Sequence, residues 1–207
     1  MELIILAVKP QDAELLYRGI RPFLHENQVV LSIMAGVKLH TIEQGTGLKK
    51  IVRAMPNLPA QIGMGMTAFT ARDEVSRKEL INVQNLLSTT GLVMYLDDEN
   101  LIDAATAVSG SGPAYVFYFM QAMMEAAQKI GFTEAQAELL VLQTFLGSVH
   151  LLGKKNVSCQ EWIRRVASKG GTTEAALHTF EQQQLNPDII SGVQAAFERA
   201  KELGKLQ

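Results

Sequence analysis

The chain has 207 residues, 47% of them hydrophobic, and its formal net charge is −2. This composition is typical of a globular protein and gives no electrostatic reason to expect a nucleic acid or a membrane surface as partner. The single cysteine, Cys159, excludes an internal disulfide, and the four histidines lack the spacing of zinc ligands. No stretch has the pattern of a signal peptide or a membrane span. We therefore expect a cytoplasmic protein without a bound metal.

The first half of the sequence alternates between strand and helix patterns, which predicts an α/β unit with a largely parallel sheet. Strands are expected at 3–8, 28–34, 51–55, 67–70 and 92–96, and helices at 12–24, 39–44 and 73–89. Asp12 is expected to cap the first helix and Gly91 to end the third. Gly45-Thr46-Gly47 is typical of a helix end followed by a turn.

After Asp97 the composition changes, because alternating β-branched runs no longer occur and the remainder has helical patterns. This change predicts a domain boundary, with one domain at 1–96 and a helical domain at 97–207. Helices are expected at 97–108, 113–130, 133–152 and 162–166, and from about Thr172 and Pro187. Thr133 with Gln136, and Ser158 with Glu161, have the spacing of capping boxes.

Two of these helices, at 113–130 and 133–152, are apolar nearly all round. A helix of this kind must be buried nearly all round, and about 110 residues have too little volume to enclose both. A second copy of the chain solves this, so we predict an intertwined homodimer. The alternative is a monomer in which the two helices bury each other and the α/β part covers the rest.

Three glycine-bearing stretches are candidate ligand sites. Residues 63–68 have the letters G-x-G-x-x-A, but they follow a proline-bounded loop and enter a strand, so a dinucleotide-phosphate turn is not expected there. Ser109-Gly110-Ser111-Gly112-Pro113-Ala114-Tyr115 fits a sharp turn with proline at a first helical position, and equally a ligand site.

The third stretch, Ser168-Lys169-Gly170-Gly171-Thr172-Thr173, runs into an apolar helical pattern. Its two glycines and three hydroxyls exceed what a helix cap requires. First-turn amides have no intrahelical partner, and the helix dipole adds positive potential there, so such a segment suits an anion. We expect the amides of Gly170, Gly171 and Thr172 to be unpaired and to converge on a small carboxylate.

These last two stretches, about fifty residues apart, resemble the signature pair of the pyrroline-5-carboxylate reductase family. The resemblance extends in the same order to Ala7-Val8-Lys9-Pro10, Ala35-Gly36-Val37, Arg53-Ala54-Met55-Pro56-Asn57-Leu58-Pro59 and Leu101-Ile102-Asp103-Ala104. It implies a Rossmann-type domain for NADPH or NADH, followed by a helical domain that interlocks with its twin. It also implies reduction of the cyclic imine of 1-pyrroline-5-carboxylate to L-proline, in proline biosynthesis.

The resemblance implies a cofactor site at two turns. The residues expected to face the cofactor are Ala7, Val8, Lys9, Pro10, Met34 and Ala35. Ligands of open α/β sheets bind at the carboxyl ends of the strands, which agrees with these positions. Arg165 replaces a smaller polar residue of the family and is a candidate contact to a cofactor phosphate.

The substrate residues implied by the resemblance are Glu99, Ser168, Gly170, Gly171, Thr172 and Thr173. The loop amides would hold the carboxylate, and the Thr173 hydroxyl, the expected catalytic contact, would bond the ring nitrogen. Hydride transfer to an imine needs positioning and a hydrogen-bond donor rather than a strong base. Glu99 matches a family position near the substrate, but a helix dipole equally explains an acid at a helix start.

Besides Arg165, the sequence departs from the family in two places. Lys169 stands where many relatives carry proline, which leaves the loop amides unaltered. The sequence opens on the apolar run 3–8, where the family first has a strand, a G-x-G-x-x-G turn and a helix. We therefore expect an N-terminally truncated Rossmann-like domain, with 3–8 as a bare apolar edge, followed by an all-α dimerisation domain.

Poor NADPH binding follows from that departure, and the sequence does not decide between NADPH and NADH. Two explanations stay open: a fragment of a reductase, or a short protein that keeps the dimer and carboxylate binding without redox activity. A helical dimerisation module without any ligand would leave the glycines and hydroxyls of 168–173 unexplained.

Overall fold

The computed structural model describes residues 2–204. The chain divides into two compact units, Met1–Pro113 with Gly192–Gln207, and Ala114–Ser191, and each is described by itself. The composition change at residue 97 falls inside the first unit, because the helix that follows it packs on the sheet. The boundary between 96 and 97 stays a prediction.

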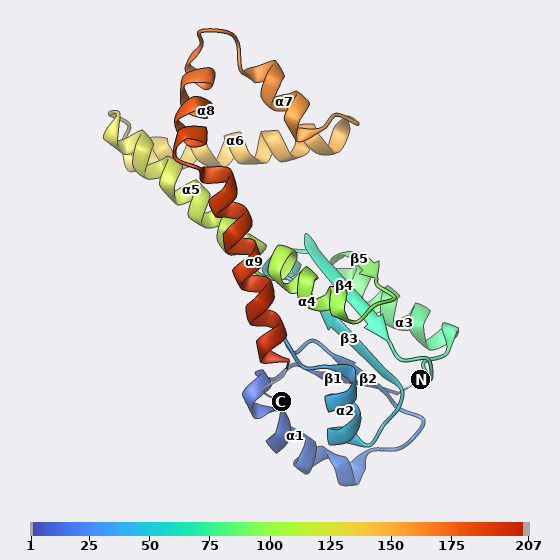
Figure 1. The fold of residues 1–207 in the computed structure, drawn as a ribbon. Coiled ribbons are helices and arrows are strands. Elements are labelled where there is room, and N and C mark those ends of the chain that lie inside the picture. Colours follow the sequence, from blue (N-terminus) through green and yellow to red (C-terminus); the bar gives the residue numbers. More distant parts are fainter. Residues whose placement is uncertain (1, 205–207) are drawn as a thin grey trace. The chain divides into compact units, whose positions relative to one another are not determined.

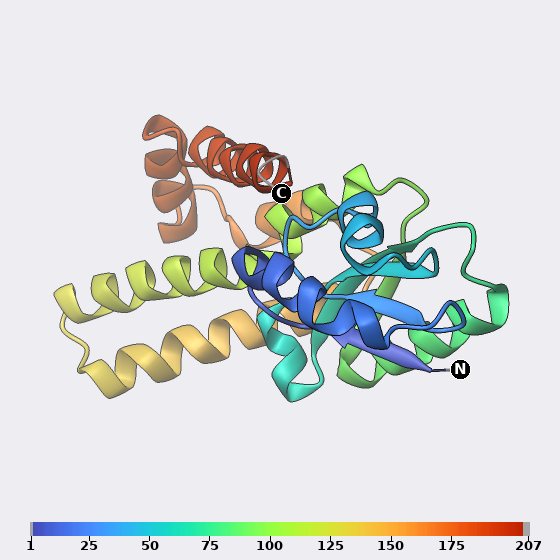
Figure 2. The ribbon, with the colours of Figure 1, turned by 90° about the horizontal axis from the view of Figure 1, so that it is seen from below.

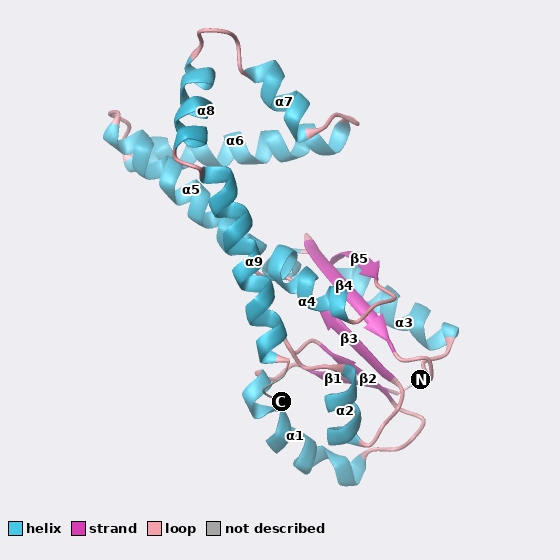
Figure 3. Ribbon diagram, in the orientation of Figure 1, coloured by secondary structure: helices cyan, strands magenta, loops and turns pink. Residues whose placement is uncertain are grey.

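The first unit is built on a five-stranded sheet (Figure 3). Its strands, in spatial as in chain order, are β1 (Leu3–Leu6), β2 (Val29–Ser32), β3 (Ile51–Met55), β4 (Gly65–Ala71) and β5 (Gly91–Tyr95). All neighbouring pairs are parallel except β3 with β4. The prediction of a largely parallel α/β sheet is confirmed.

Helices cover both faces of this sheet, because successive strand side chains point to opposite faces. On one face, Val30 and Ile51 pack with α1 (Ala13–Ile20) and α2 (Leu39–Thr46). On the other, Val29, Leu31 and Val52 pack with α3 (Arg77–Leu87). Each of these strand side chains is almost completely buried, which stabilises the fold by roughly 1.5–3 kcal/mol per residue.

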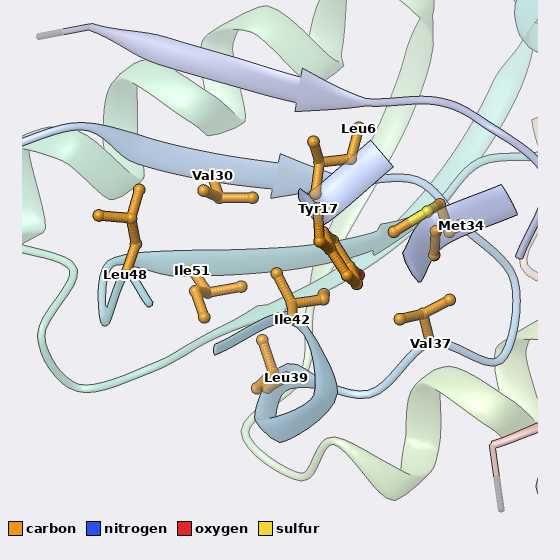
Figure 4. Close-up of a cluster of buried hydrophobic side chains, with 10 residues drawn as sticks. Leu6, Tyr17, Val30, Met34, Val37, Leu39, Ile42, Leu48 and Ile51 are labelled. Carbon is orange, nitrogen blue, oxygen red and sulfur yellow. The ribbon is translucent and has the colours of Figure 1, made fainter. Parts of the chain in front are cut away.

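The α1–α2 face is shown in Figure 4. Tyr17 of α1 lies among the apolar side chains of the strands and of α2, and burial raises the pKa of Tyr17 to about 12. Gly45 on α2 leaves the room that the tyrosine ring occupies. Gly47, at φ +76°, ends α2, which confirms the expected helix end.

The first strand lies at an edge of the sheet, where β2 is its partner among the described residues. Its exposure agrees with the expected apolar edge, since the Ile5 side chain is 51% exposed.

Of two helix-boundary predictions in this unit, one is wrong and one is confirmed. Asp12 does not cap α1 with its side chain, because residues 10–12 already form a 3₁₀ turn and Asp12 has a helical backbone conformation. α3 stops at Leu87, but the 3₁₀ turn Ser88–Thr90 continues it and has Gly91 as its C-cap, so Gly91 ends the helical run as expected. Gly91 also begins β5 at φ +143°, packed against Gly65 of β4, and this close approach of two strands requires a glycine.

The expected sharp turn at 109–112 is also wrong. The helix α4 (Asn100–Ala105) continues into a π-helical segment, Thr106–Gly110, and then into α5 (Gly112–Lys129). The Ser111 amide donates to the Thr106 carbonyl at 2.8 Å, which is the i to i−5 bond of a π-helix. Gly110 thus lies in a widened helical turn, a feature found often at functional sites, and Gly112 begins α5.

The second unit is helical (Figure 1). Besides most of α5 it contains α6 (Glu134–Lys154), α7 (Cys159–Val166), α8 (Thr172–Gln182) and the first part of α9 (Leu185–Leu203), whose remainder belongs to the first unit. The capping box of Thr133 and Gln136 is present. Ser158 caps α7, but the Glu161 side chain does not complete that box and pairs with arginines instead.

Helices α5 and α6 form an antiparallel pair, visible in Figure 2, with an edge-to-face contact between Phe119 and Phe145. Their apolar surface is nevertheless largely open. Large exposed apolar side chains include Val116, Phe117, Tyr118, Leu139, Leu142, Leu146 and Val149. By length and composition α6 could cross a membrane, a criterion that core helices also meet, yet only 11% of its most apolar window is buried within the chain.

Candidate functional site

The carboxyl edge of the sheet gathers the residues expected to face a cofactor. Strands β1, β2 and β3 run parallel, so the segments that follow them leave at the same edge. The Ile33 amide donates to the Leu6 carbonyl at 3.0 Å, which holds the starts of the first two segments together. The structure therefore brings Ala7–Pro10 beside Met34 and Ala35.

The two turns differ in how far their side chains are exposed to a ligand. Ala7 and Lys9 are exposed and Pro10 begins a 3₁₀ turn, so this segment is open to a ligand. The Met34 side chain is buried in the core on the α1–α2 face (Figure 4). Contacts from the second turn to a ligand are consequently limited to the backbone of Met34 and to Ala35.

Sequence reasoning did not assign Asn57, which follows β3 at the same edge. Its side-chain amide donates to Ser109 Oγ at 3.2 Å, and its Oδ1 accepts from the Met66 amide at 2.9 Å. A Cβ at Gly110 would lie 2.8 Å from Met55 Cε, so the π-helical segment packs closely against the end of β3. The signal was the Arg53–Pro59 motif, whose polar member at the strand end is Asn57.

Glu99 is tied to the interior of the first unit. Its Oε1 accepts from the Leu39 amide at 2.7 Å and from Arg53 Nη1 at 3.1 Å. The side chain is partly buried and bonds to α2 rather than to the helix it precedes.

In the second unit, the glycine loop (168–173) leads directly into α8, with Gly171 at the N-cap. Gly170 has φ +72°, a left-handed conformation that glycine adopts without strain. The Ser168 carbonyl accepts the Gly171 amide at 3.0 Å, and Glu174 Oε2 accepts the Gly170 amide at 2.6 Å.

The expectation of unpaired amides at Gly170 and Gly171 is therefore wrong, because local acceptors take both. First-turn amides of a helix have no intrahelical partner, and no acceptor in the described part of the chain is seen for those of Thr172 and Thr173. The Thr173 side chain is partly exposed beside them. The anion-binding capacity of this loop thus lies one to two residues later than expected.

Arg165 is engaged by its own helix. Its Nε donates to Glu161 Oε1 at 2.9 Å, and its guanidinium lies 5.1 Å from the centre of the Trp162 ring. The hydrogen bond from Arg165, with the charge of Arg164, lowers the pKa of Glu161. The side chain is half exposed, and contact with a cofactor phosphate stays a prediction.

A mostly parallel sheet with open turns at its carboxyl edge, followed by a helical unit with a glycine loop at a helix start, defines a Rossmann-like α/β protein with an added helical domain. Comparisons with known proteins name the family. Residues 99–203 match the family model described as pyrroline-5-carboxylate reductase dimerisation.

Curated relatives match along nearly the whole chain. The chain is 38% identical over 205 residues to pyrroline-5-carboxylate reductase of Pseudomonas aeruginosa, covering 99% of this chain and 75% of that protein. It is 39% identical over 204 residues to the reductase of Synechocystis, covering 99% and 76%. The chain thus spans about three quarters of the length of these relatives.

Solved structures agree. The NADP-bound pyrroline carboxylate reductase of Plasmodium falciparum has a TM-score of 0.93 at 31% identity, covering 98% of this chain and 77% of that one. The Coxiella burnetii enzyme has a TM-score of 0.88 at 36% identity, covering 97% and 75%. The chain belongs to the pyrroline-5-carboxylate reductase family, which confirms the resemblance and the fold class, and the dimerisation match indicates a homo-oligomer.

Proposed function

We propose that this chain acts in proline biosynthesis as an NAD(P)H-dependent reductase of 1-pyrroline-5-carboxylate, forming L-proline. The observation that carries the proposal is the glycine loop at the start of α8, inside the family's dimerisation domain. Its two first-turn amides, at Thr172 and Thr173, suit a carboxylate, and a threonine hydroxyl stands beside them.

The carboxyl edge of the sheet fits the nicotinamide end of a dinucleotide. Ala7 and Ala35 are small, and Asn57 and Ser109 supply polar groups at the same edge. When bound there, the cofactor supplies a hydride. The contributions of this chain are to orient the two reactants and to exclude unproductive geometries, which is where much enzymatic rate enhancement originates.

Thr173 is the proposed catalytic residue. A hydroxyl that donates to the ring nitrogen keeps the C=N carbon electron-poor while that carbon accepts the hydride. The nitrogen takes up one proton from water, through the hydroxyl, and becomes the proline amine. The Thr172 and Thr173 amides hold the substrate carboxylate, and Ser168 and Gly170 shape the loop around them. No general base is needed, so the role fits a loop that offers hydroxyls and amides.

A second copy of the chain completes the helical unit in this proposal, giving an intertwined homodimer. The exposed apolar faces of α5 and α6 support it, because such surface is costly in water and is typical of obligate interfaces. A cytoplasmic location and a small imino acid as substrate belong to the same proposal.

The test follows NADPH absorbance with pyrroline-5-carboxylate as substrate. Replacing Thr173 by Ala removes the donor, and we expect turnover to fall about a hundredfold, while Thr173→Ser keeps most of the activity. Thr179→Ala is the matched control, because its hydroxyl donates to the Ala175 carbonyl and lies nearly two helical turns beyond the loop.

Unchanged turnover in Thr173→Ala would contradict the catalytic assignment. A wild-type chain that binds L-proline calorimetrically but does not oxidise NADPH would favour the alternative function, dimerisation with carboxylate binding and no redox step. The 63–68 motif bears on this alternative, because it enters β4 instead of a helix and so supplies no phosphate turn.

A further inference from the structure

A buried ion network joins β3 to the start of α4. Arg53, 1% exposed, donates from Nη2 to Asp103 Oδ1 at 2.5 Å and from Nη1 to Glu99 Oε1 at 3.1 Å. Asp103 is equally buried, and Lys38 Nζ lies 3.9 Å from its second oxygen. Two positive and two negative side chains thus meet inside the first unit.

Stability alone is a poor explanation for such a network. Burying charges costs desolvation energy, and apolar side chains of similar volume often fill such a space as well or better. Arg53 also keeps its Nε buried with no hydrogen-bond partner among the described residues. The guanidinium therefore bonds two carboxylates while its Nε has no partner. This arrangement suits a residue whose role is to hold those carboxylates in place.

The network reaches the start of α2 through Lys38 and, at a shorter distance, through Glu99 Oε1. Glu99 Oε1, which accepts from Arg53, also accepts the Leu39 amide at 2.7 Å. Leu39 is the first residue of α2, and the N-cap residue, Lys38, makes no side-chain cap. Glu99 therefore caps α2 from a segment sixty residues away, where the helix dipole favours a negative charge.

The segment between β2 and α2, here the β2–α2 turn (33–38), is fixed at both ends by these contacts. At its start the Met34 amide donates to Ser32 Oγ at 3.3 Å. At its centre Gly36 has φ +76°, and a Cβ there would lie 2.9 Å from Leu203 Cβ at the end of α9. At its end the Glu99 bond holds Leu39.

We propose that Glu99, held by Arg53, is a positioning residue that fixes the β2–α2 turn at the cofactor edge of the sheet. The inference rests on the proposed function for the identity of the ligand at that edge, while the clamp itself is a property of the protein without ligand. It assigns Glu99 to the cofactor turn, in place of the substrate contact that the family resemblance implies.

Hydrogen exchange of the full chain, followed by mass spectrometry, tests the clamp without any ligand. In Glu99→Ala, peptides covering 33–39 should exchange about tenfold faster, the effect of losing one charge-assisted hydrogen bond. Glu99→Gln retains an acceptor oxygen for Leu39 and should restore most of the protection. Glu43 is also on α2, and Glu43→Gln breaks its ion pair with Arg72. This variant should leave the exchange rate of 33–39 unchanged.

Asp103→Asn separates positioning from stability, because it weakens the network while leaving the Glu99–Leu39 bond. It should lower the melting temperature without selective exchange at 33–39. If Glu99→Ala does not fold, Glu99→Gln carries the test: protection at 33–39 must stay near that of the wild type while the melting temperature falls. Unchanged exchange in a folded Glu99→Ala, or faster exchange spread evenly over β1–β5, would overturn the proposal.

Kinetics distinguish this proposal from the proposed function. We expect Glu99→Ala to raise the KM for NADPH and to leave the KM for the imine unchanged. A raised imine KM with an unchanged NADPH KM would return Glu99 to the substrate site. A wild type without reductase activity would contradict the proposed function, whereas the exchange result would still decide the clamp.

Discussion

The two units of this protein solve the burial of apolar side chains differently. In the first, the sheet residues Val29, Val30 and Ile51 are completely buried by helices of the same chain. In the second, α5 has no fully buried residue and α6 has two, Ala137 and Val141. The sheet unit closes its own core, whereas the helical unit leaves apolar faces that a second copy of the chain can cover.

The substitution expected to have the most severe effect lies on α6 and changes the dissociation constant of the homodimer. Leu139, Leu142, Leu146 and Val149 recur every three or four residues and so share one face of α6. This face is exposed and lies away from the buried Ala137 and Val141. A glutamate at 142 places two charges in a homodimer interface, which should cost at least about 3 kcal/mol per dimer and raise the dissociation constant more than a hundredfold. Sedimentation equilibrium measures the mass.

The matched control for Leu142→Glu is Leu15→Glu, on the exposed face of α1 in the sheet unit. It should leave the mass unchanged. A wild-type protein that sediments as a monomer, or a Leu142→Glu variant that remains fully dimeric, would contradict the assignment of this face.

The stability of the sheet unit should also depend on pH, to a lesser degree. Glu79 caps α3 in the sheet unit, and hydrogen bonds from Lys50 and then Ser76 lower the pKa of Glu79 to about 2. Because the unfolded value is near 4.3, the ionised carboxylate contributes stability above about pH 4.5, and this contribution is lost as the pH falls toward 2. Partial exposure limits the contribution to about 1 kcal/mol or less.

Acid unfolding followed by circular dichroism measures the contribution of Glu79 to the free energy of unfolding. Glu79→Gln should be less stable than wild type at pH 6 and should approach it as the pH falls to 2. Glu161→Gln, on the exposed surface of α7, should show a smaller difference. An equal stability deficit for Glu79→Gln at pH 6 and at pH 2 would exclude the ion pair as its cause.

Local patterns predicted much of the fold. The strand pattern at 51–55, ended by Pro56, predicted the bounds of β3, and the Thr133 and Gln136 pair marked the start of α6. Gly91 shows the limit of this reasoning, because its role as a helix end was predictable but its close approach to Gly65 was not. That approach depends on the pairing of β4 with β5, which has no local signature in the sequence.

The candidate site was predictable in position but not in its hydrogen bonds. The residues after β1 and β2 meet at one edge because parallel strands share a direction. The amides of Gly170 and Gly171 were expected to be free, but the Ser168 carbonyl and the Glu174 carboxylate accept them. Which nearby group accepts an amide depends on the loop conformation, which the sequence pattern does not determine. The Glu99–Leu39 bond spans sixty residues, beyond the reach of any local pattern.

The most direct test of the carboxylate assignment removes the Thr172 amide, and Thr172→Ala, which removes only the hydroxyl, separates the effects of the two groups. Thr172 is the first residue of α8, where proline is tolerated, and the preceding Gly171 has an extended backbone that proline permits. Cys159→Pro, at the equivalent position of α7, is the matched control. Calorimetric titration with L-proline should show binding weakened about tenfold in Thr172→Pro, the effect of one lost charge-assisted hydrogen bond, and unchanged in Cys159→Pro. Equal affinity for wild type and a folded Thr172→Pro would contradict the account.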